Sequence, residues 1–284
     1  MGTAPIFPPH RVTLVGVLNL TPDSFSDGGR LLRRDGSPDL SAALAAARAL
    51  LAAGADVLDV GGESTRPGAA PVSVELEIAR TRAVIEALAK ELRAPLSIDT
   101  RKAAVAEAAL AAGAHVVNDV SGLRHDTALA RVAEAAGASL VLGHLRGEPE
   151  RMQQEIQFGD VLREVADELA HAATRARALG FRGELVVDPG LGFGKHLAHN
   201  LALIANVAEL KRRVGLPVLL GPSRKRFLAE LTGDDVAERD LATAIVSGIA
   251  VFAGADALRV HDAGAARRAR AIGAALREAR SAAP

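Results

Sequence analysis

The chain has 284 residues, of which 49% are hydrophobic and 24% charged, a composition that fits a globular protein and not a disordered one. Its 34 Lys and Arg side chains balance 34 Asp and Glu side chains, and it contains neither Trp nor Tyr, which argues against a nucleic-acid binder and against binding to an anionic membrane. The absence of Cys excludes disulfides, thiolate zinc sites and a cysteine nucleophile.

The N-terminus, MGTAPIFPPHR, has no apolar stretch behind a basic start, and no segment of the chain reaches the length of a membrane span. With the lack of Cys, these features predict a cytoplasmic protein. We expect residues 1–10 to form an N-terminal extension and the whole chain, 1–284, to fold as one domain.

Short apolar segments alternate with longer segments along the chain. The predicted strands are, in order, VTLVGVL, DVLDV, PLSID, HVVNDV, SLVLG, ELVVD, PVLLG and ALRV. Repeated strand–helix units of this kind predict a closed (β/α)₈ TIM barrel, with an open Rossmann-like sheet as the alternative. No insertion is long enough for a second domain.

The segments between the strands carry apolar residues three or four positions apart, which is typical of helices that cover a sheet. The clearest predicted helices are Leu40–Ala53, Val74–Leu92, Asp160–Leu179, His199–Val214 and Ala263–Arg280. Several helix ends are marked by a glycine that can adopt a left-handed conformation, namely Gly54, Gly113, Gly137 and Gly180.

Most of the unusual polar residues come directly after a predicted strand, at the ends that converge on one face of a barrel. They are Asn19, Asp23, Asp27, Thr65, Arg66, Asp99, Asn118, Asp188, Ser223, Lys225, Arg259 and His261. A single Asp in such a place is more often the N-cap of the next helix than a catalytic group. Independent caps, however, would not also bring Asn118, Lys225, Arg259 and His261 to the same rim, so we expect one pocket.

The residue types in this pocket indicate what it binds. Asp99, Asn118 and Asp188 offer acceptors that suit the donor-rich edge of a guanidine-like heterocycle. Lys225 and Arg259 supply cationic donors for carbonyl or ring-nitrogen acceptors and for anions. The sequence by itself therefore predicts a barrel that binds a polar heterocycle and an anion, without naming the reaction.

Two further motifs narrow the chemistry. Asn19, Asp23 and Asp27 are oxygen ligands that suit a Mg²⁺ ion held partly by a pyrophosphate. The segment DPGLGFGK is not a phosphate-binding P-loop, because Pro189 stands where the first glycine is required and His196 follows the lysine. Its glycines are predicted to let the backbone pass close to a flat ligand. No HExxH or GxSxG motif supports zinc-dependent or serine hydrolysis.

Seven of the sequence motifs, taken in chain order, resemble those of a known family. GVLNLTPDSFSDGG, ESTRPGA, SIDT, VVNDVSG, DPGLGFGK, GPSRK and RVHD resemble, in this order, the signatures of the dihydropteroate synthases, and the match spans Val15 to Asp262. The resemblance implies a transferase of folate biosynthesis that joins 6-hydroxymethyl-7,8-dihydropterin pyrophosphate to para-aminobenzoate. It also implies a homodimer, a Mg²⁺ cofactor and inhibition by sulfonamides.

The resemblance also implies roles for individual residues. Asn19 would contact Mg²⁺, Thr65 would contact the pyrophosphate of the pterin substrate, Arg259 would stack on the pterin, and Arg259 with His261 would bind the pyrophosphate. Four polar side chains would bind the pterin ring: Asp99, Asn118, Asp188 and Lys225. Five residues would frame para-aminobenzoate: Phe25, Arg66, Pro67, Phe193 and Ser223. The reaction would be a dissociative substitution without a covalent enzyme intermediate.

The sequence departs from the family pattern after the fifth strand, where Gly143 and Leu145 stand in place of two methionines. We expect the missing Met side chain at Gly143 to leave extra room near the pterin. Leu191, where the family commonly has Phe, is a milder change. Two other functions stay open, a paralogue that binds pterin without making dihydropteroate and a methyltransferase module that binds methyltetrahydrofolate.

Overall fold

The structure of the protein is a computed structural model, which describes residues 4–22, 29–64, 68–147, 152–154 and 156–282. Eight parallel strands form one sheet in the order β6-β5-β4-β3-β2-β1-β8-β7. They are β1 (Thr13–Asn19), β2 (Val57–Gly61), β3 (Leu96–Asp99), β4 (Val116–Asp119), β5 (Ser139–Gly143), β6 (Leu185–Asp188), β7 (Leu219–Leu220) and β8 (Ala257–Val260). All eight coincide with the predicted segments.

The sheet closes between β6 and β7. Val187 and Val218 form a parallel bridge, and the Val187 N–H donates to the carbonyl of Pro217 at 2.9 Å. The predicted (β/α)₈ barrel is therefore confirmed, and the open Rossmann-like sheet is excluded.

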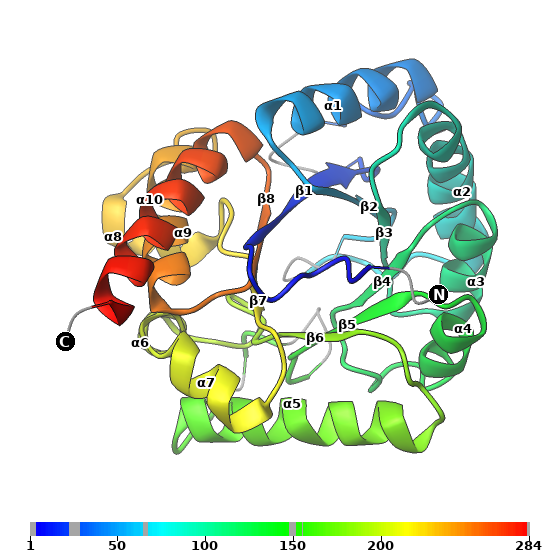
Figure 1. The fold of residues 1–284 in the computed structure, drawn as a ribbon. Helices are drawn as coiled ribbons and strands as arrows, with labels where there is room; N and C mark the ends of the chain where they lie inside the picture. Colours follow the sequence, from blue (N-terminus) through cyan, green and yellow to red (C-terminus); the bar gives the residue numbers. More distant parts are fainter. Residues whose placement is uncertain (1–3, 23–28, 65–67, 148–151, 155, 283–284) are drawn as a thin grey trace.

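Helices surround the strands as an outer layer (Figure 1). They are α1 (Leu40–Ala53), α2 (Val74–Glu91), α3 (Ala103–Ala111), α4 (Leu129–Ala135), α5 (Val161–Ala178), α6 (Leu197–Ala205), α7 (Val207–Val214), α8 (Arg226–Thr232), α9 (Asp240–Ala253) and α10 (Ala263–Ser281). α1 shows the local signals that set these boundaries. The side chain of Asp39 accepts from the N–H of Ala42, and Gly54, with φ of 114°, ends the helix by donating to Leu50.

One predicted helix is wrong in detail. The segment His199–Val214 is not one helix but two, α6 and α7, which meet at Asn206 with φ of −114° and ψ of 31°. The Asn206 side-chain amide donates to the carbonyl of Ala202 at 2.8 Å, a local bond that competes with the regular helix. The connection between β7 and β8 likewise contains two helices, α8 and α9.

The amino end of the barrel is filled with apolar side chains. Inward-facing residues of seven strands form one buried cluster: Val15, Val57, Val116, Val141, Val186, Leu219 and Ala257. Phe7 joins this cluster and is 4% exposed. The backbone N–H groups of Ile6 and Phe7 donate to the carboxylate of Glu184 at 3.1 and 3.0 Å, which holds the N-terminal segment across the barrel opening (Figure 1). This end of the barrel is therefore sealed, and polar groups inside it must lie toward the other end.

Within the described ranges, none of the helices has both the length and the apolar character needed to cross a lipid bilayer.

Candidate active site

The polar residues of the candidate site follow the apolar cluster on the same strands. Side chains two residues apart on a strand point to the same face, so a residue two positions after a cluster member also points into the barrel. This relation holds for Val57 and Asp59, Val116 and Asn118, Val186 and Asp188, and Ala257 and Arg259. The strand register also pairs Gly61 with Asp99 and Asp99 with Asn118. The barrel therefore places a polar layer directly above its apolar one.

Arg259 lies at the centre of this polar layer. Its Nε donates to Asp59 Oδ2 at 2.6 Å, and its Nη2 donates to Asp99 Oδ2 at 2.7 Å. The side-chain amide of Asn118 donates to the same Asp59 oxygen at 3.2 Å. Charge-assisted hydrogen bonds to two carboxylates fix the plane of the guanidinium, which is the group predicted to stack on the pterin.

Asp59 is a site residue that the sequence reasoning did not single out. Its side chain is fully buried, and its Oδ1 has no hydrogen-bond partner among the described residues. The signal was present in the segment DVLDV, where an acid stands in the middle of an apolar strand. A buried carboxylate is rare unless it is paired, so its position alone pointed to a partner such as Arg259.

Burial and neighbouring charges act against each other in this layer. Burial raises the pKa of Asp99 to about 7, an effect that Arg259 opposes and that Asp59 reinforces. Burial lowers the pKa of Arg259, but the charges of Asp59 and Asp99 outweigh this and raise it overall. Arg259 therefore stays cationic, whereas Asp99 titrates near neutral pH.

Asp188 and Lys225 form a second charged pair beside Arg259. Burial raises the pKa of Asp188, and the charge of Lys225 opposes the rise. Burial lowers the pKa of Lys225 to about 8, and the charge of Asp188 opposes the fall. Lys225 also donates to the carbonyl of Leu191, and its ammonium lies 4.2 Å from the centre of the Phe193 ring. The two strand ends thus hold the DPGLGFGK loop between them.

The first glycine of this loop is required by a contact inside the protein. Gly190 has φ of +66°, and a Cβ built on it would lie 2.0 Å from the carbonyl oxygen of His144. Its N–H donates to Asp188 Oδ1 at 2.8 Å. Gly192 borders the cavity described below, and a Cβ there would lie 3.1 Å from Cδ of Lys225. The prediction that this loop passes close to a flat ligand stays a prediction.

Asn19, Ser223 and His261 meet at the ends of β1, β7 and β8. Ser223 Oγ lies 2.9 Å from His261 Nδ1 and accepts from the His261 backbone N–H at 3.1 Å. The side-chain amide nitrogen of Asn19 lies 3.4 Å from His261 Nε2. The structure therefore brings together the predicted metal ligand, one predicted anion-binding residue and one residue predicted to contact the aniline substrate.

The backbone between Ser223 and Lys225 is strained. Arg224 has φ of 56°, a left-handed conformation that costs a residue with a Cβ about 1–3 kcal/mol. The surroundings hold it there, since Arg224 Nε and Nη2 donate to the two carboxylate oxygens of Asp240 at 2.8 Å each. The Arg224 N–H donates to Thr243 Oγ1 at 3.1 Å. Helix α9, which carries both partners, thus fixes the turn that presents two predicted site residues.

These groups surround a cavity of about 780 Å³ at the carboxyl ends of the strands. The predicted residues that line it are Asn19, Asp99, Phe193, Ser223, Lys225, Arg259 and His261. Asn118 and Asp188 contact the groups beneath this lining, at Asp59 and Gly190. The remaining predicted site residues, Phe25, Thr65, Arg66 and Pro67, lie outside the described residues, as do Asp23 and Asp27.

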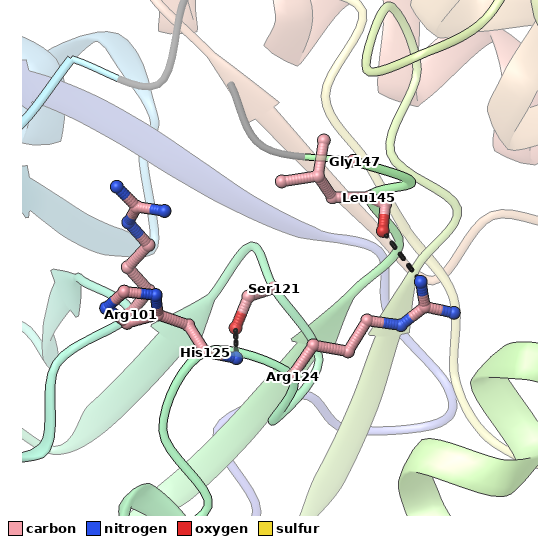
Figure 2. Close-up of a pocket in the computed structure, with 6 residues that line it drawn as sticks. All are labelled: Arg101, Ser121, Arg124, His125, Leu145 and Gly147. Carbon is pink, nitrogen blue, oxygen red and sulfur yellow. Dashed lines mark hydrogen bonds between the residues drawn. The ribbon is translucent and has the colours of Figure 1, made fainter. Parts of the chain in front are cut away.

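A smaller cavity of about 230 Å³ lies beyond β3, β4 and β5 (Figure 2). It is lined by Arg101, Ser121, Arg124, His125, Leu145 and Gly147. Arg101 donates to Glu63 at 3.2 Å, and Arg124 forms an ion pair with Glu168 and donates to the carbonyl of Leu145 at 3.2 Å. The charges of both arginines are therefore matched by carboxylates. Asp99, Lys195 and Lys225, whose pKa values burial shifts strongly, line the larger cavity instead.

The expectation of extra room at Gly143 is wrong. A Cβ built on Gly143 would lie 2.6 Å from both Cα and the carbonyl oxygen of Val120. The backbone of the loop after β4 therefore occupies the space that a side chain would need. Leu145 is 5% exposed and borders the smaller cavity, and Leu191 is fully buried, so neither opens space in the larger one.

Comparison with known proteins agrees with this geometry. A family model described as pterin binding enzyme matches residues 15–261. The chain is 41% identical over 254 residues to a dihydropteroate synthase of Synechocystis sp., which covers 89% of this chain and 86% of the relative. It is 45% identical over 259 residues to a dihydropteroate synthase of Mycobacterium leprae, which covers 88% of each chain.

Solved structures show the same likeness. The Yersinia pestis dihydropteroate synthase in complex with a sulfonamide drug has a TM-score of 0.88 and 38% identity, covering 96% of both chains. The Thermus thermophilus dihydropteroate synthase in complex with 4-aminobenzoate has a TM-score of 0.80 and 43% identity, covering 94% of this chain and 95% of that one. The chain therefore belongs to the pterin-binding enzymes and, within them, to the dihydropteroate synthases, which are transferases of folate biosynthesis.

Proposed function

We propose that the large cavity condenses 6-hydroxymethyl-7,8-dihydropterin pyrophosphate with para-aminobenzoate to give 7,8-dihydropteroate and pyrophosphate. The observation that carries this assignment is the placement of Arg259 between Asp59 and Asp99 on the wall of a cavity that Lys225 and His261 also line. One site thus offers acceptors for a heterocycle and cations for an anion. The complexes of the Thermus and Yersinia relatives with 4-aminobenzoate and a sulfonamide support the choice of the aniline substrate.

The pterin would lie against the polar layer. Asp188 and Asn118 would meet the amino and ring N–H groups of the heterocycle, and Lys225 would donate to its carbonyl or ring nitrogen. Arg259 would lie on its face, since two carboxylates already fix the guanidinium plane. Asp99, whose pKa is raised to about 7 by burial, would be able to accept or donate a hydrogen bond near neutral pH.

The pyrophosphate would lie toward Asn19, Arg259 and His261. Mg²⁺ prefers oxygen ligands and is commonly held by substrate phosphates and one or two protein groups, so the amide oxygen of Asn19 suits it. When bound, the ion would neutralise charge on the leaving pyrophosphate. The contact of His261 with Ser223 and Asn19 would keep its ring beside the same anion.

The reaction breaks the bond between the pterin methylene and the pyrophosphate oxygen, and the electron pair of that bond leaves with the pyrophosphate. A new bond forms from the methylene to the aniline nitrogen, which loses its proton to the pyrophosphate or to water. The cationic residues would stabilise the charge that develops on the leaving group, and the cavity would hold the aniline in line with the methylene. Phe193 and Ser223 would frame the aniline substrate, together with Phe25, Arg66 and Pro67 from outside the described residues. No covalent enzyme intermediate is required.

The decisive experiment measures pyrophosphate release by the purified enzyme. We expect release only when both substrates and Mg²⁺ are present, with one dihydropteroate formed for each pyrophosphate. Binding of the pterin without turnover would instead identify the non-synthesising paralogue. The comparisons lend no support to that alternative or to the methyltransferase module.

We also propose that the enzyme acts as a homodimer, as the family resemblance implies. Helix α9 exposes Leu241, Ile245 and Ile249, four residues apart, with exposed fractions of 72, 56 and 50%. Neighbouring α10 exposes Ile272 and Leu276. An apolar face of this kind supports contact with a second copy of the chain. Light scattering should give the mass of a dimer, and Ile245→Glu should give a monomer.

Location in the cytoplasm stays a prediction from the sequence.

A further inference from the structure

Lys195 is a buried charged residue that the proposed reaction does not use. It ends the DPGLGFGK loop, is 4% exposed and borders the large cavity. Its ammonium lies 2.9 Å from His144 Nδ1 and donates to the carbonyl of Phe193 at 3.1 Å. A lysine is almost never buried in this way unless its ammonium is paired or has a function, because removing an ammonium from water is unfavourable.

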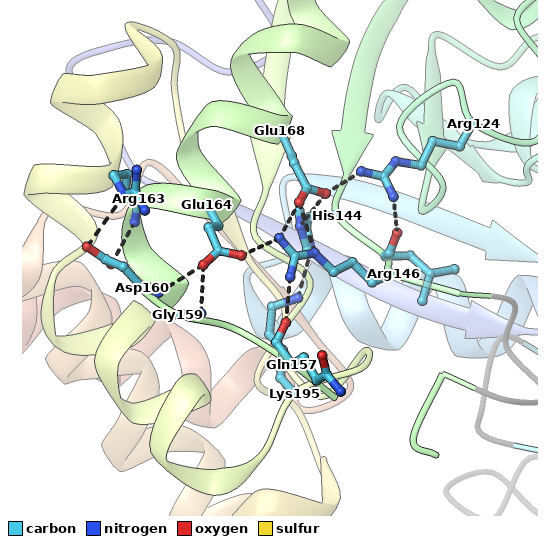
Figure 3. Close-up of polar contacts among 11 residues, drawn as sticks. Arg124, His144, Arg146, Gln157, Gly159, Asp160, Arg163, Glu164, Glu168 and Lys195 are labelled. Atoms are coloured by element: carbon cyan, nitrogen blue, oxygen red, sulfur yellow. Dashed lines mark hydrogen bonds and ion pairs between the residues drawn. The ribbon is translucent and has the colours of Figure 1, made fainter. Parts of the chain in front are cut away.

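The partners of Lys195 continue as a chain of contacts that leads away from the cavity (Figure 3). Since the ammonium can only donate, His144 accepts at Nδ1. His144 Nε2 lies 3.2 Å from Glu168 Oε2, close enough for an electrostatic contact although the geometry does not make a hydrogen bond. Arg146 Nε donates to Glu168 at 2.9 Å, and Arg124 also pairs with Glu168. The contacts therefore connect the loops after β4, β5 and β6 to helix α5.

Four charged residues on different elements affect the pKa of Lys195. Asp188 of β6 and Glu168 of α5 favour the ammonium, whereas Lys225 after β7 and Arg146 after β5 disfavour it. Burial lowers the pKa of Lys195 to about 7 against the effect of Asp188. Burial and the charge of Lys195 lower the pKa of His144 to about 4, so this histidine is neutral at neutral pH. Lys195 is thus the cation that titrates in this cluster near pH 7.

Two observations place Lys195 against the loop that carries Asp188 and Phe193. Its Nζ lies 3.5 Å from the position that a Cβ would take on Gly190, whose N–H donates to Asp188. It also holds the carbonyl of Phe193, the residue whose ring lies against Lys225. Lys195 therefore contacts the loop at Phe193, lies beside Gly190, and adds a positive charge that favours the ionised form of Asp188.

We propose that Lys195, seated on His144 and supported by Glu168, is a positioning residue for the pterin substrate: its ammonium holds the DPGLGFGK loop in place and keeps the Asp188 carboxylate ready to bind. This inference rests on the proposed function, since it assigns Asp188 to the pterin. It predicts that pterin binding depends on a proton that no substrate-contacting residue carries.

The test uses calorimetric titration of the enzyme with pterin pyrophosphate and Mg²⁺ between pH 6 and 9, together with steady-state kinetics. Lys195→Met keeps the aliphatic stem and removes the charge. We expect it to weaken pterin binding at least about tenfold at pH 6.5, equivalent to about 1.4 kcal/mol. The KM for para-aminobenzoate should change less, because Lys195 meets Phe193 only at its backbone carbonyl. The part of the loss of affinity between pH 6 and 8 that comes from Lys195 should be absent, and the steps from Asp99 and Lys225 should remain.

Glu168→Gln is the matched variant, because it alters the charge facing Lys195 without touching the cavity lining. Removing this carboxylate disfavours the ammonium, so the pH at which the wild type loses pterin affinity should move downward. If Lys195→Met does not fold, this shift alone decides, and an unmoved midpoint overturns the inference. Equal pterin affinity and an equal pH profile in Lys195→Met would overturn it as well. A wild type that does not bind the pterin substrate would instead refute the proposed function.

Discussion

Gly143→Ala adds a single methyl group at the point where the family pattern has a methionine. The built Cβ lies 2.6 Å from Cα and from the carbonyl oxygen of Val120, whereas ordinary contacts of this kind begin near 3.4 Å. The neighbouring atoms belong to the backbone, so they cannot rotate away as the end of a side chain would. Gly143 has no left-handed φ, and the whole effect must therefore come from this contact.

The size of the effect follows from two opposing contributions. Overpacking of a filled interior costs about 1–3 kcal/mol. Replacing Gly by Ala restricts the unfolded chain and returns about 0.4–1 kcal/mol. We therefore expect a net loss of about 1–2 kcal/mol in the free energy of unfolding, measured by urea titration, and a lower thermal midpoint. A larger side chain, in Gly143→Met, should cost more, although it restores the family residue.

The added methyl group should also disturb the site, because it pushes the backbone of Val120. Val120 lies two residues after Asn118, so its displacement would move the end of β4. Pterin affinity should fall together with stability. Gly159→Ala is the control, since its nearest neighbour is the flexible end of Glu164 at 3.4 Å, and its stability should change by less than about 0.5 kcal/mol. If Gly143→Ala proved as stable as the wild type and bound pterin equally well, the loop after β4 would be able to move away from the added methyl group. The expected losses of stability and of pterin affinity would then be refuted.

Four further outcomes are expected. Asp59→Asn removes one of the two carboxylates that hold Arg259 and should reduce kcat/KM for the pterin substrate at least about tenfold, a loss that unchanged kinetics would contradict. Asp188→Ala and Lys225→Ala should each weaken pterin binding by about 1.5–3 kcal/mol in calorimetry and leave aniline binding nearly unchanged. Asn19→Ala should lower Mg²⁺-dependent turnover strongly, and full activity of the wild type in excess chelator would disprove the metal role. Asp99 has a folded-state pKa of about 7, raised by burial from 3.8, so its contribution to stability is present in full below pH 3.8 and is lost as the pH rises toward 7. In urea unfolding, the wild type should therefore lose stability relative to Asp99→Asn over this range, and a constant difference would refute the shift.

The strands could be predicted from the sequence because each is a short apolar run with a turn signal on either side. The site could be predicted because a closed barrel must bring all eight carboxyl ends to one face, so Asn19, Asp99 and Arg259 did not have to be placed individually. The place of the site follows from the topology of the barrel more than from any single motif.

The rest depended on contacts between segments, which a single sequence does not reveal. Asp59 lies in the middle of an apolar strand and not after its end, so the search for polar residues at strand ends did not include it. The extra room expected at Gly143 is filled by the backbone of Val120, a neighbour that is distant in sequence. At the break, the Asn206 side chain bonds the carbonyl of Ala202 in the preceding helical turn, a contact that periodicity alone cannot detect.

The closure between β6 and β7 has a consequence for how the enzyme responds to its substrate. β7 has two residues, and Pro217 beside it has no N–H to donate, so fewer backbone hydrogen bonds join these strands than join their neighbours. Asp188 ends one side of this junction and Lys225 follows the other. A pterin bound to both would act as a crosslink across the weakest line of the barrel, slowing amide hydrogen exchange at Val187 before any change reached the outer helices.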